Sequence, residues 1–213
     1  MPRRTADWVV WAKVAVWLGA LTPLAVLLWD TAHGNLAAEP VKDIQHRTGK
    51  TALVLLLITL ANTPLRQLTE RGVLIRFRRL TGLFAFFYAT LHFGSYLLFD
   101  LQFAFGDLAE DVVKRPWITI GFLVFLMLLT LAITSPRAMV RRLGSRRWNA
   151  IHRLVYVAAV GTVVHFFLSV KKDVTVPLQF AVVLGVLLGV RLWLSRRSGR
   201  TPSRARASSP SER

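Results

Sequence analysis

Residues 80–99, which read LTGLFAFFYATLHFGSYLLF, decide the fold class of this chain. The stretch contains no Asp, Glu, Lys or Arg, and His92 is its only histidine. A helix needs roughly 20 mostly apolar residues to cross the ~30 Å hydrocarbon core of a bilayer. A helix of a soluble domain would instead confine its apolar residues to one face. The stretch therefore predicts a membrane-spanning helix.

Five other blocks of the chain have the same character, and hydrophobic residues make up 54% of its 213 residues. The first block is too long for the apolar core of a signal peptide, so we interpret it as a helix as well. The sequence predicts an all-α integral membrane protein, a six-transmembrane-helix bundle over residues 1–194. The six predicted spans are Trp8–Trp29, Thr51–Leu68, Leu80–Phe99, Trp117–Thr134, Ile151–Leu168 and Leu178–Leu194.

The basic residues are distributed unequally between the two sides of this bundle. Most of the 28 Lys and Arg residues lie before the first span, between spans two and three, between spans four and five, and after the last span. Because basic loops stay in the cytoplasm, both termini are predicted to be cytoplasmic. Residues 195–213, rich in Ser, Arg and Pro, are predicted to form a disordered basic cytoplasmic tail attracted to anionic membrane lipid.

Composition also excludes several classes of function. A net charge of +17 would indicate nucleic-acid binding in a soluble protein, but here basic cytoplasmic loops explain it, and we expect no nucleic-acid partner. The absence of cysteine excludes disulfides, thiolate metal sites and iron–sulfur clusters held by this chain. A redox cofactor would therefore be held by histidine or by non-covalent packing.

Two histidines are predicted to lie inside the bilayer at one level. From the cytoplasmic ends of their spans, His92 lies roughly 18 Å deep and His165 roughly 21 Å deep. One intramembrane histidine usually just bonds a neighbouring helix, whereas two at one level suit bis-histidine ligation of haem. Gly161 lies one helical turn before His165 and would let a flat macrocycle approach the backbone.

His152 is open to two interpretations. It lies near the cytoplasmic boundary, ~20 Å along the helix from His165, where it could ligate a second haem or remain an interfacial histidine. Span three offers no matching histidine at that depth and instead carries Arg78 and Arg79. Their guanidinium groups could pair with haem propionates or with a flavin phosphate.

Four segments carry a resemblance to a known family. They are TLANTPLR (59–66), RRLTGLFAFFYATLH (78–92), LAITS (131–135) and WNAIHRLVY (148–156), and the later His165 joins them. In these segments the chain resembles the MsrQ family (formerly YedZ), the haem-binding membrane subunits of periplasmic protein-methionine-sulfoxide reductase systems, within the ferric-reductase-like transmembrane group.

The resemblance implies a multi-pass protein of the bacterial inner membrane that transfers electrons and is not itself the catalytic reductase. Electrons from the quinol pool, or from a cytoplasmic reductase, would pass through haem b to a periplasmic molybdopterin-containing methionine sulfoxide reductase that repairs oxidised proteins. The two proteins would form a heterodimer. Family members are also described as binding FMN, so this flavin is a second cofactor that the resemblance suggests.

The resemblance also assigns residues. His92 and His165 match the intramembrane haem ligands, and His152 is the further candidate. Related ferric reductases and NADPH oxidases have two histidines in span three where this chain has one, so the count of one haem or two stays open. Three alternative functions also stay open: a stand-alone ferric or quinone reductase-like cytochrome b, a proton-relay transporter without haem, and a lipid-embedded scaffold with no cofactor. The lack of carboxylates in the spans disfavours the transporter.

Overall fold

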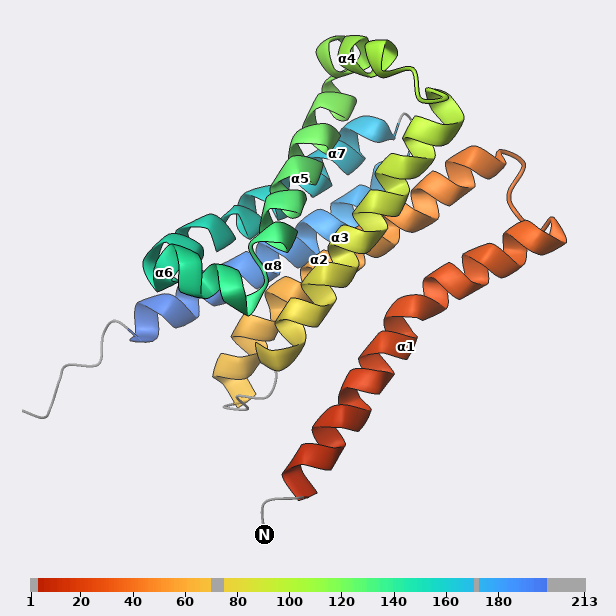
Figure 1. Ribbon diagram of the computed structural model, residues 1–213. Helices are drawn as coiled ribbons and strands as arrows, with labels where there is room; N and C mark the ends of the chain where they lie inside the picture. Colours follow the sequence, from red (N-terminus) through yellow and green to blue (C-terminus); the bar gives the residue numbers. More distant parts are fainter. Residues whose placement is uncertain (1–3, 70–74, 171–172, 199–213) are drawn as a thin grey trace, which may run out of the picture.

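The computed structural model describes residues 4–69, 75–170 and 173–198, and these residues form helices and short connections without any strand (Figure 1). The all-α prediction is therefore confirmed. In chain order the elements are α1 (Arg4–His33), α2 (Pro40–Thr69), α3 (Ile75–Ser95), the π-helical turn η2 (Tyr96–Asp100), α4 (Phe105–Lys114), α5 (Pro116–Ile133), α6 (Arg137–His152), α7 (Leu154–Ser169) and α8 (Thr175–Ser198).

Six stretches of the described residues are long and apolar enough to cross a membrane, which confirms the predicted number of spans. These stretches are Trp8–His33, Pro40–Thr69, Phe77–Asp100, Pro116–Ile133, Arg137–Ser169 and Thr175–Arg197. The bundle has one end capped by α4, called here the α4 end, and an opposite end beside α6, called the α6 end. The start of α1 and the end of α8 both lie at the α6 end (Figure 1).

Several helices differ from the sequence prediction. Helix α2 begins at Pro40 rather than Thr51, because Arg47 forms ion pairs with Asp30 and Asp43 that support a polar extension of the apolar span. The short helices α4 and α6 lie in segments predicted as loops, since neither has the apolar length that identifies a span. Helix α8 continues through Ser198, into the predicted tail, and residues 199–213 of that tail lie outside the described residues.

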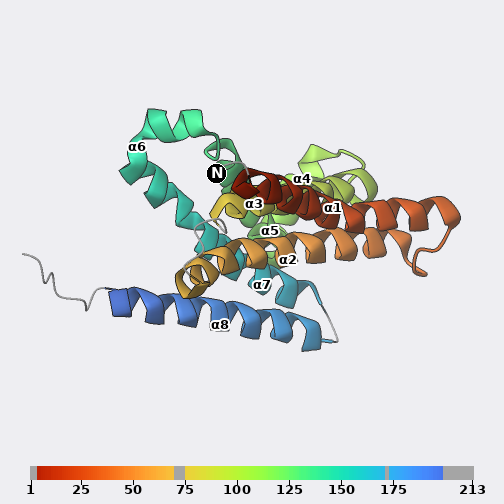
Figure 2. The same ribbon diagram turned by 90° about the horizontal axis from the view of Figure 1, so that it is seen from below.

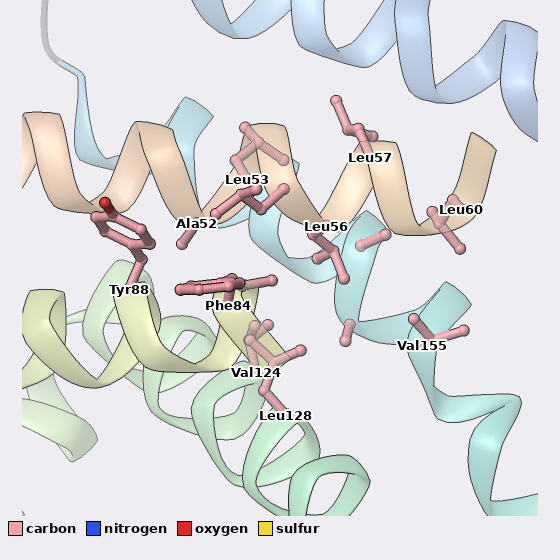
Figure 3. Packing of buried hydrophobic residues seen from close by; sticks show 14 of the residues in the cluster. Ala52, Leu53, Leu56, Leu57, Leu60, Phe84, Tyr88, Val124, Leu128 and Val155 are labelled. Carbon is pink, nitrogen blue, oxygen red and sulfur yellow. The ribbon is translucent and has the colours of Figure 1, made fainter. Parts of the chain in front are cut away.

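The core lies between four helices, α2, α3, α5 and α7 (Figure 3). The most extensive contacts join α2 to α3 and α5 to α7. Small residues at these contacts, including the fully buried Ala85, Ala158 and Ala159, let the helix backbones approach closely. The larger core side chains are Leu53, Leu56 and Leu60 of α2, Phe84 and Tyr88 of α3, Val124 and Leu128 of α5, and Val155 of α7.

Many large apolar side chains face away from the core, as a lipid environment requires. Trp11 is 72% exposed and Leu28 is 61% exposed on α1, and Val186 is 58% exposed on α8. In a bilayer such side chains contact acyl chains, while the helical backbone satisfies its own hydrogen bonds. Helix α1 is a peripheral spanning helix that contacts α2 and α3 (Figures 1 and 2).

Helix α6 forms the first part of the fifth of these stretches, leads from α5 to α7, and is bent at Gly144. This glycine has φ 74° and ψ 154°, a conformation that disfavours residues with a Cβ. Figure 2 shows α6 as a bent segment at the side of the bundle. Its exposed basic side chains are Arg137, Arg141, Arg142, Arg146 and Arg147.

Candidate functional site

His92 of α3 and His165 of α7 face each other inside the bundle. Their ring centroids lie 6.0 Å apart, and the two ring planes make an angle of 76°. Both side chains are partly buried, and each lies near the α4 end of its helix. The structure thus brings together the two histidines that the sequence placed at one level, and their role as ligands stays a prediction.

His92 rests against helix α2. Its Nδ1 atom lies 2.9 Å from the backbone carbonyl oxygen of Gln45. One turn further along α2 is Gly49, where an added Cβ would lie 3.1 Å from Nδ1 of His92 and 3.2 Å from Cε1. The imidazole therefore packs directly against the backbone of α2, where its Nδ1 atom bonds the Gln45 carbonyl and its ring lies over Gly49.

His165 rests against helix α5 in the same way. Its Nδ1 atom lies 2.7 Å from the carbonyl oxygen of Trp117, in the first turn of α5. One turn further is Gly121, where an added Cβ would lie 2.7 Å from Cε1 of His165 and 2.8 Å from Nδ1. Each histidine thus has a carbonyl–glycine seat on a neighbouring helix, formed by Gln45 and Gly49 or by Trp117 and Gly121.

The seats determine the chemical form of both imidazoles. A carbonyl oxygen can only accept a hydrogen bond, so Nδ1 carries the proton in each ring and a neutral ring keeps the lone pair on Nε2. Metal-ligating histidines commonly donate their other ring N–H to a backbone carbonyl in this way, which orients the ring and raises its basicity. Within the described residues, neither Nε2 atom has a hydrogen-bond partner.

The spacing of the two rings fits an iron atom bound between them. A centroid distance of 6.0 Å would let both imidazoles bind one iron atom, and that iron would supply one-electron chemistry. The described residues contain no group of three or more His, Cys, Asp or Glu that could hold a metal ion alone. A pair of neutral imidazoles is the protein ligand set that haem needs, because the macrocycle supplies the other four nitrogens.

An aromatic residue follows each histidine of the pair in the sequence and contacts a neighbouring helix. Phe93, next to His92, contacts Phe122 and Phe125 of α5, with ring centroids 5.9 and 4.7 Å apart. Phe166, next to His165, contacts Phe180 of α8 at 6.2 Å. These apolar rings would keep water from a bound group.

Gly161 contacts a neighbouring helix. A Cβ added to it would lie 2.7 Å from Cγ2 of Val124, so the glycine allows α7 to approach α5 closely. The structure gives Gly161 this packing role, and the predicted contact with a macrocycle stays a prediction.

His152 lies in a separate cluster at the α6 end. Its Nε2 atom is 3.2 Å from the Thr134 hydroxyl oxygen, and its ring stacks on Trp148 with a centroid distance of 3.9 Å. The indole N–H of Trp148 donates to the Thr134 carbonyl at 2.9 Å. His152 is therefore already hydrogen-bonded at the α5–α6 junction, and it is not paired with a second histidine among the described residues.

The predicted arginines lie at the same end. Arg78 is partly buried and lies within electrostatic range of His152, Tyr156 and Arg191, whereas Arg79 is exposed. In the part of the chain that the structure describes, no carboxylate pairs with either arginine. Both guanidinium groups can therefore pair with an anionic group, and their contact with a haem propionate or a flavin phosphate stays a prediction.

Sequence reasoning missed the four seat residues, Gln45, Gly49, Trp117 and Gly121. Two of them act through backbone carbonyls, which carry no sequence signal. The glycines had a weak signal, since each lies near the α4 end of a span at the level of the paired histidines. The positions of these glycines could not be interpreted without knowing which helices are neighbours.

The α4 end carries an acidic surface close to this site. A cavity of about 450 Å³ is lined by Asp100, Leu101, Asp107, Glu110, Asp111 and Arg115. The side-chain amide of Gln45 donates a hydrogen bond to Asp100, which lines this cavity, and the backbone carbonyl of Gln45 bonds His92.

Comparison with known proteins gives a consistent result. The profile of the family described as ferric reductase like transmembrane component matches residues 44–163, which include His92 and end two residues before His165. The sequence is also similar along nearly its whole length to proteins named protein-methionine-sulfoxide reductase heme-binding subunit MsrQ.

Three of these relatives illustrate the similarity. The protein of Xanthomonas oryzae pv. oryzae is 46% identical over 210 residues, which covers 96% of each chain. That of Xanthomonas campestris pv. campestris is 47% identical over 208 residues, 95% of each chain. That of Rhodospirillum rubrum is 47% identical over 197 residues, 90% of this chain and 93% of the relative.

Proposed function

The chain belongs to the ferric-reductase-like transmembrane family and, within it, to the MsrQ subunits, and from this premise we propose that it carries electrons through haem b held by His92 and His165. It is a multi-pass membrane protein, and its bacterial relatives point to the inner membrane. The observation that carries the proposal is the facing pair of imidazoles, 6.0 Å apart, with both Nδ1 atoms tied to backbone carbonyls.

The chain's own residues prepare the site for this cofactor. The carbonyls of Gln45 and Trp117 hold each imidazole in the tautomer whose Nε2 lone pair is free to bind a metal. Neutral imidazoles place no charge in the bilayer, and the phenylalanines that follow them in the sequence would help to exclude water. Haem bound there would supply one-electron transfer, with its potential tuned by ligand basicity and burial.

The direction of transfer follows from the position of the site. His92 precedes Asp100 by eight residues, about 12 Å along a helix, so the pair lies close to the α4 end. With both termini in the cytoplasm, as the basic residues indicate, this end faces the periplasm. Electrons from quinol or a cytoplasmic reductase would leave there for a periplasmic molybdopterin-containing methionine sulfoxide reductase, which forms a heterodimer with this subunit and repairs oxidised proteins.

Two finer points are part of the proposal as alternatives. His152 is either an interfacial histidine bonded to Thr134 or the ligand of a second haem. Arg78 and Arg79 are the candidates for binding the phosphate of FMN, since a guanidinium group pairs well with phosphate.

The test is an absorption spectrum of the purified protein, oxidised and dithionite-reduced, after haem-replete expression. We expect low-spin b-type bands that are lost or altered in His92→Ala and in His165→Ala. His33→Ala is the matched control, because His33 is an exposed histidine of α1 whose ring bonds the Trp29 carbonyl of its own helix. His152→Ala separates one haem from two by the ratio of haem to protein.

Two results would overturn the proposal. A colourless wild-type protein would leave a transporter or another function without haem. Full spectra in both His92→Ala and His165→Ala would place the haem elsewhere. Reduction of ferric iron or quinone at full rate without any periplasmic partner would favour a stand-alone reductase.

A further inference from the structure

We propose that Gly49 and Gly121 are positioning residues that hold the two axial imidazoles in crossed planes, so that the bound haem is a low-spin haem with nearly perpendicular ligands. This inference rests on the proposed function, because it concerns the haem assigned to His92 and His165. It goes beyond it by naming the residues that set the rotation of each ligand and the electronic type of the haem that results.

The two seats have one construction. In each, a carbonyl at position i accepts the Nδ1 proton and a glycine at i+4, on the same helical face, lies under the ring. An imidazole bound through Nε2 can otherwise rotate about the metal–nitrogen bond. The Nδ1 hydrogen bond and the helix surface beneath the ring remove this freedom.

The angle between the rings follows from the positions of the seats. Gln45 and Gly49 belong to α2, whereas Trp117 and Gly121 belong to α5, so the two rings are fixed by different helices. The resulting interplanar angle is 76°, far from parallel. Crossed imidazole planes interact with different d orbitals of the iron, which leaves those orbitals close in energy and makes the oxidised low-spin haem strongly anisotropic in its magnetic resonance spectrum.

A side chain at either glycine would disturb its ring. At Gly121 a Cβ would stand 2.7 and 2.8 Å from two ring atoms of His165, so the ring must move and its bond to Trp117 must lengthen. At Gly49 the distances are 3.1 and 3.2 Å, which a smaller shift relieves. Gly94, two residues after His92, has open space in front of it and provides the matched control.

The experiment is electron paramagnetic resonance of the oxidised full-length protein, with the haem-to-protein ratio measured on the same samples. We expect a strongly anisotropic low-spin signal in the wild type and in Gly94→Ala. The largest g value should fall, or the signal should turn high-spin, in Gly121→Ala, with a smaller change in Gly49→Ala. A role in packing alone would lower the yield of folded protein without moving the signal of the haem that remains.

Each outcome of this experiment either supports or overturns the positioning role of the two glycines. A wild-type signal typical of parallel ligand planes would overturn the crossed geometry while leaving the proposed function intact. An unchanged signal in both Gly49→Ala and Gly121→Ala would overturn the positioning role. If Gly121→Ala does not fold, the milder Gly49→Ala variant decides that role. Absence of haem from the wild type would instead overturn the proposed function.

Discussion

The hydroxyl of Tyr88 donates a hydrogen bond to the backbone carbonyl of Ala20, at 2.7 Å. The same hydroxyl accepts the backbone N–H of Leu24, at 3.1 Å. In a regular helix the Leu24 N–H would bond the Ala20 carbonyl directly, but Pro23 disturbs this turn of α1. Tyr88 of α3 therefore bonds two backbone groups of α1 beside Pro23 and joins this peripheral helix to the core.

Removing this hydroxyl should destabilise the protein without affecting the histidine pair. Tyr88 is 1% exposed, so Tyr88→Phe removes the hydroxyl partner of two backbone groups where water cannot reach them. The cost of such groups is about 1–3 kcal/mol. Thermal unfolding in detergent should show a lower midpoint. Tyr156→Phe is the control, because the ring that lies 4.5 Å beneath Arg191 is kept; an equal loss in both variants would refute the bridging role.

The contact between Gly161 and Val124 predicts a pair of compensating substitutions. Gly161→Ala should cost about 1–3 kcal/mol, because its Cβ would lie 2.7 Å from Val124 in a well-packed interface. Val124→Ala removes the colliding methyl groups and should restore most of the stability of the double variant, which thermal unfolding would measure.

The haem spectrum of the same variants separates the two roles of Gly161. If the glycine serves helix packing, the double variant regains a normal spectrum together with its stability. If a macrocycle lies against Gly161, the spectrum stays altered even when Val124→Ala relieves the collision. Gly185→Ala on α8 is the control, since its Cβ would meet no atom within 4 Å.

The sequence predicted the spans well because the bilayer imposes a simple rule of length and polarity. The same rule located His92 and His165 at one level, since depth depends only on the rise along each helix. The rule did not predict the extension of α2 to Pro40, because this part of the helix is stabilised by the pairing of Arg47 with Asp30 and Asp43. The seats formed by Gly49 and Gly121 escaped it too, because they depend on which helix lies beside each histidine.

The hydrogen bond between His152 and Thr134 predicts a coupling between these residues. Thr134→Val and His152→Ala each remove one partner of the same 3.2 Å contact. Their effects on stability should therefore be non-additive, with a coupling of about 0.5–1.5 kcal/mol in a double-mutant cycle of thermal or denaturant unfolding.

The control for this cycle is Thr130→Val. The Thr130 hydroxyl is exposed and bonds only the carbonyl of Leu126 in its own helix, at 2.9 Å. Thr130→Val and His152→Ala should be additive. Additivity of Thr134→Val with His152→Ala would show that the contact contributes nothing, and a loss of haem from His152→Ala would assign this histidine to a second haem.

The orientation of the bundle predicts which introduced cysteines are accessible from outside the cell. The chain has no cysteine, so a single substitution gives a label without background. Gly106 in α4 and Ser145 in α6 are both exposed, and they lie at opposite ends of the bundle (Figure 1). In spheroplasts, a membrane-impermeant maleimide should label Gly106→Cys at once and Ser145→Cys only after permeabilisation. We expect this pattern because α6 is rich in arginine, and arginine-rich segments stay on the cytoplasmic side during membrane insertion. The reverse pattern would place the histidine pair near the cytoplasm and would remove the proposed exit of electrons at the α4 end.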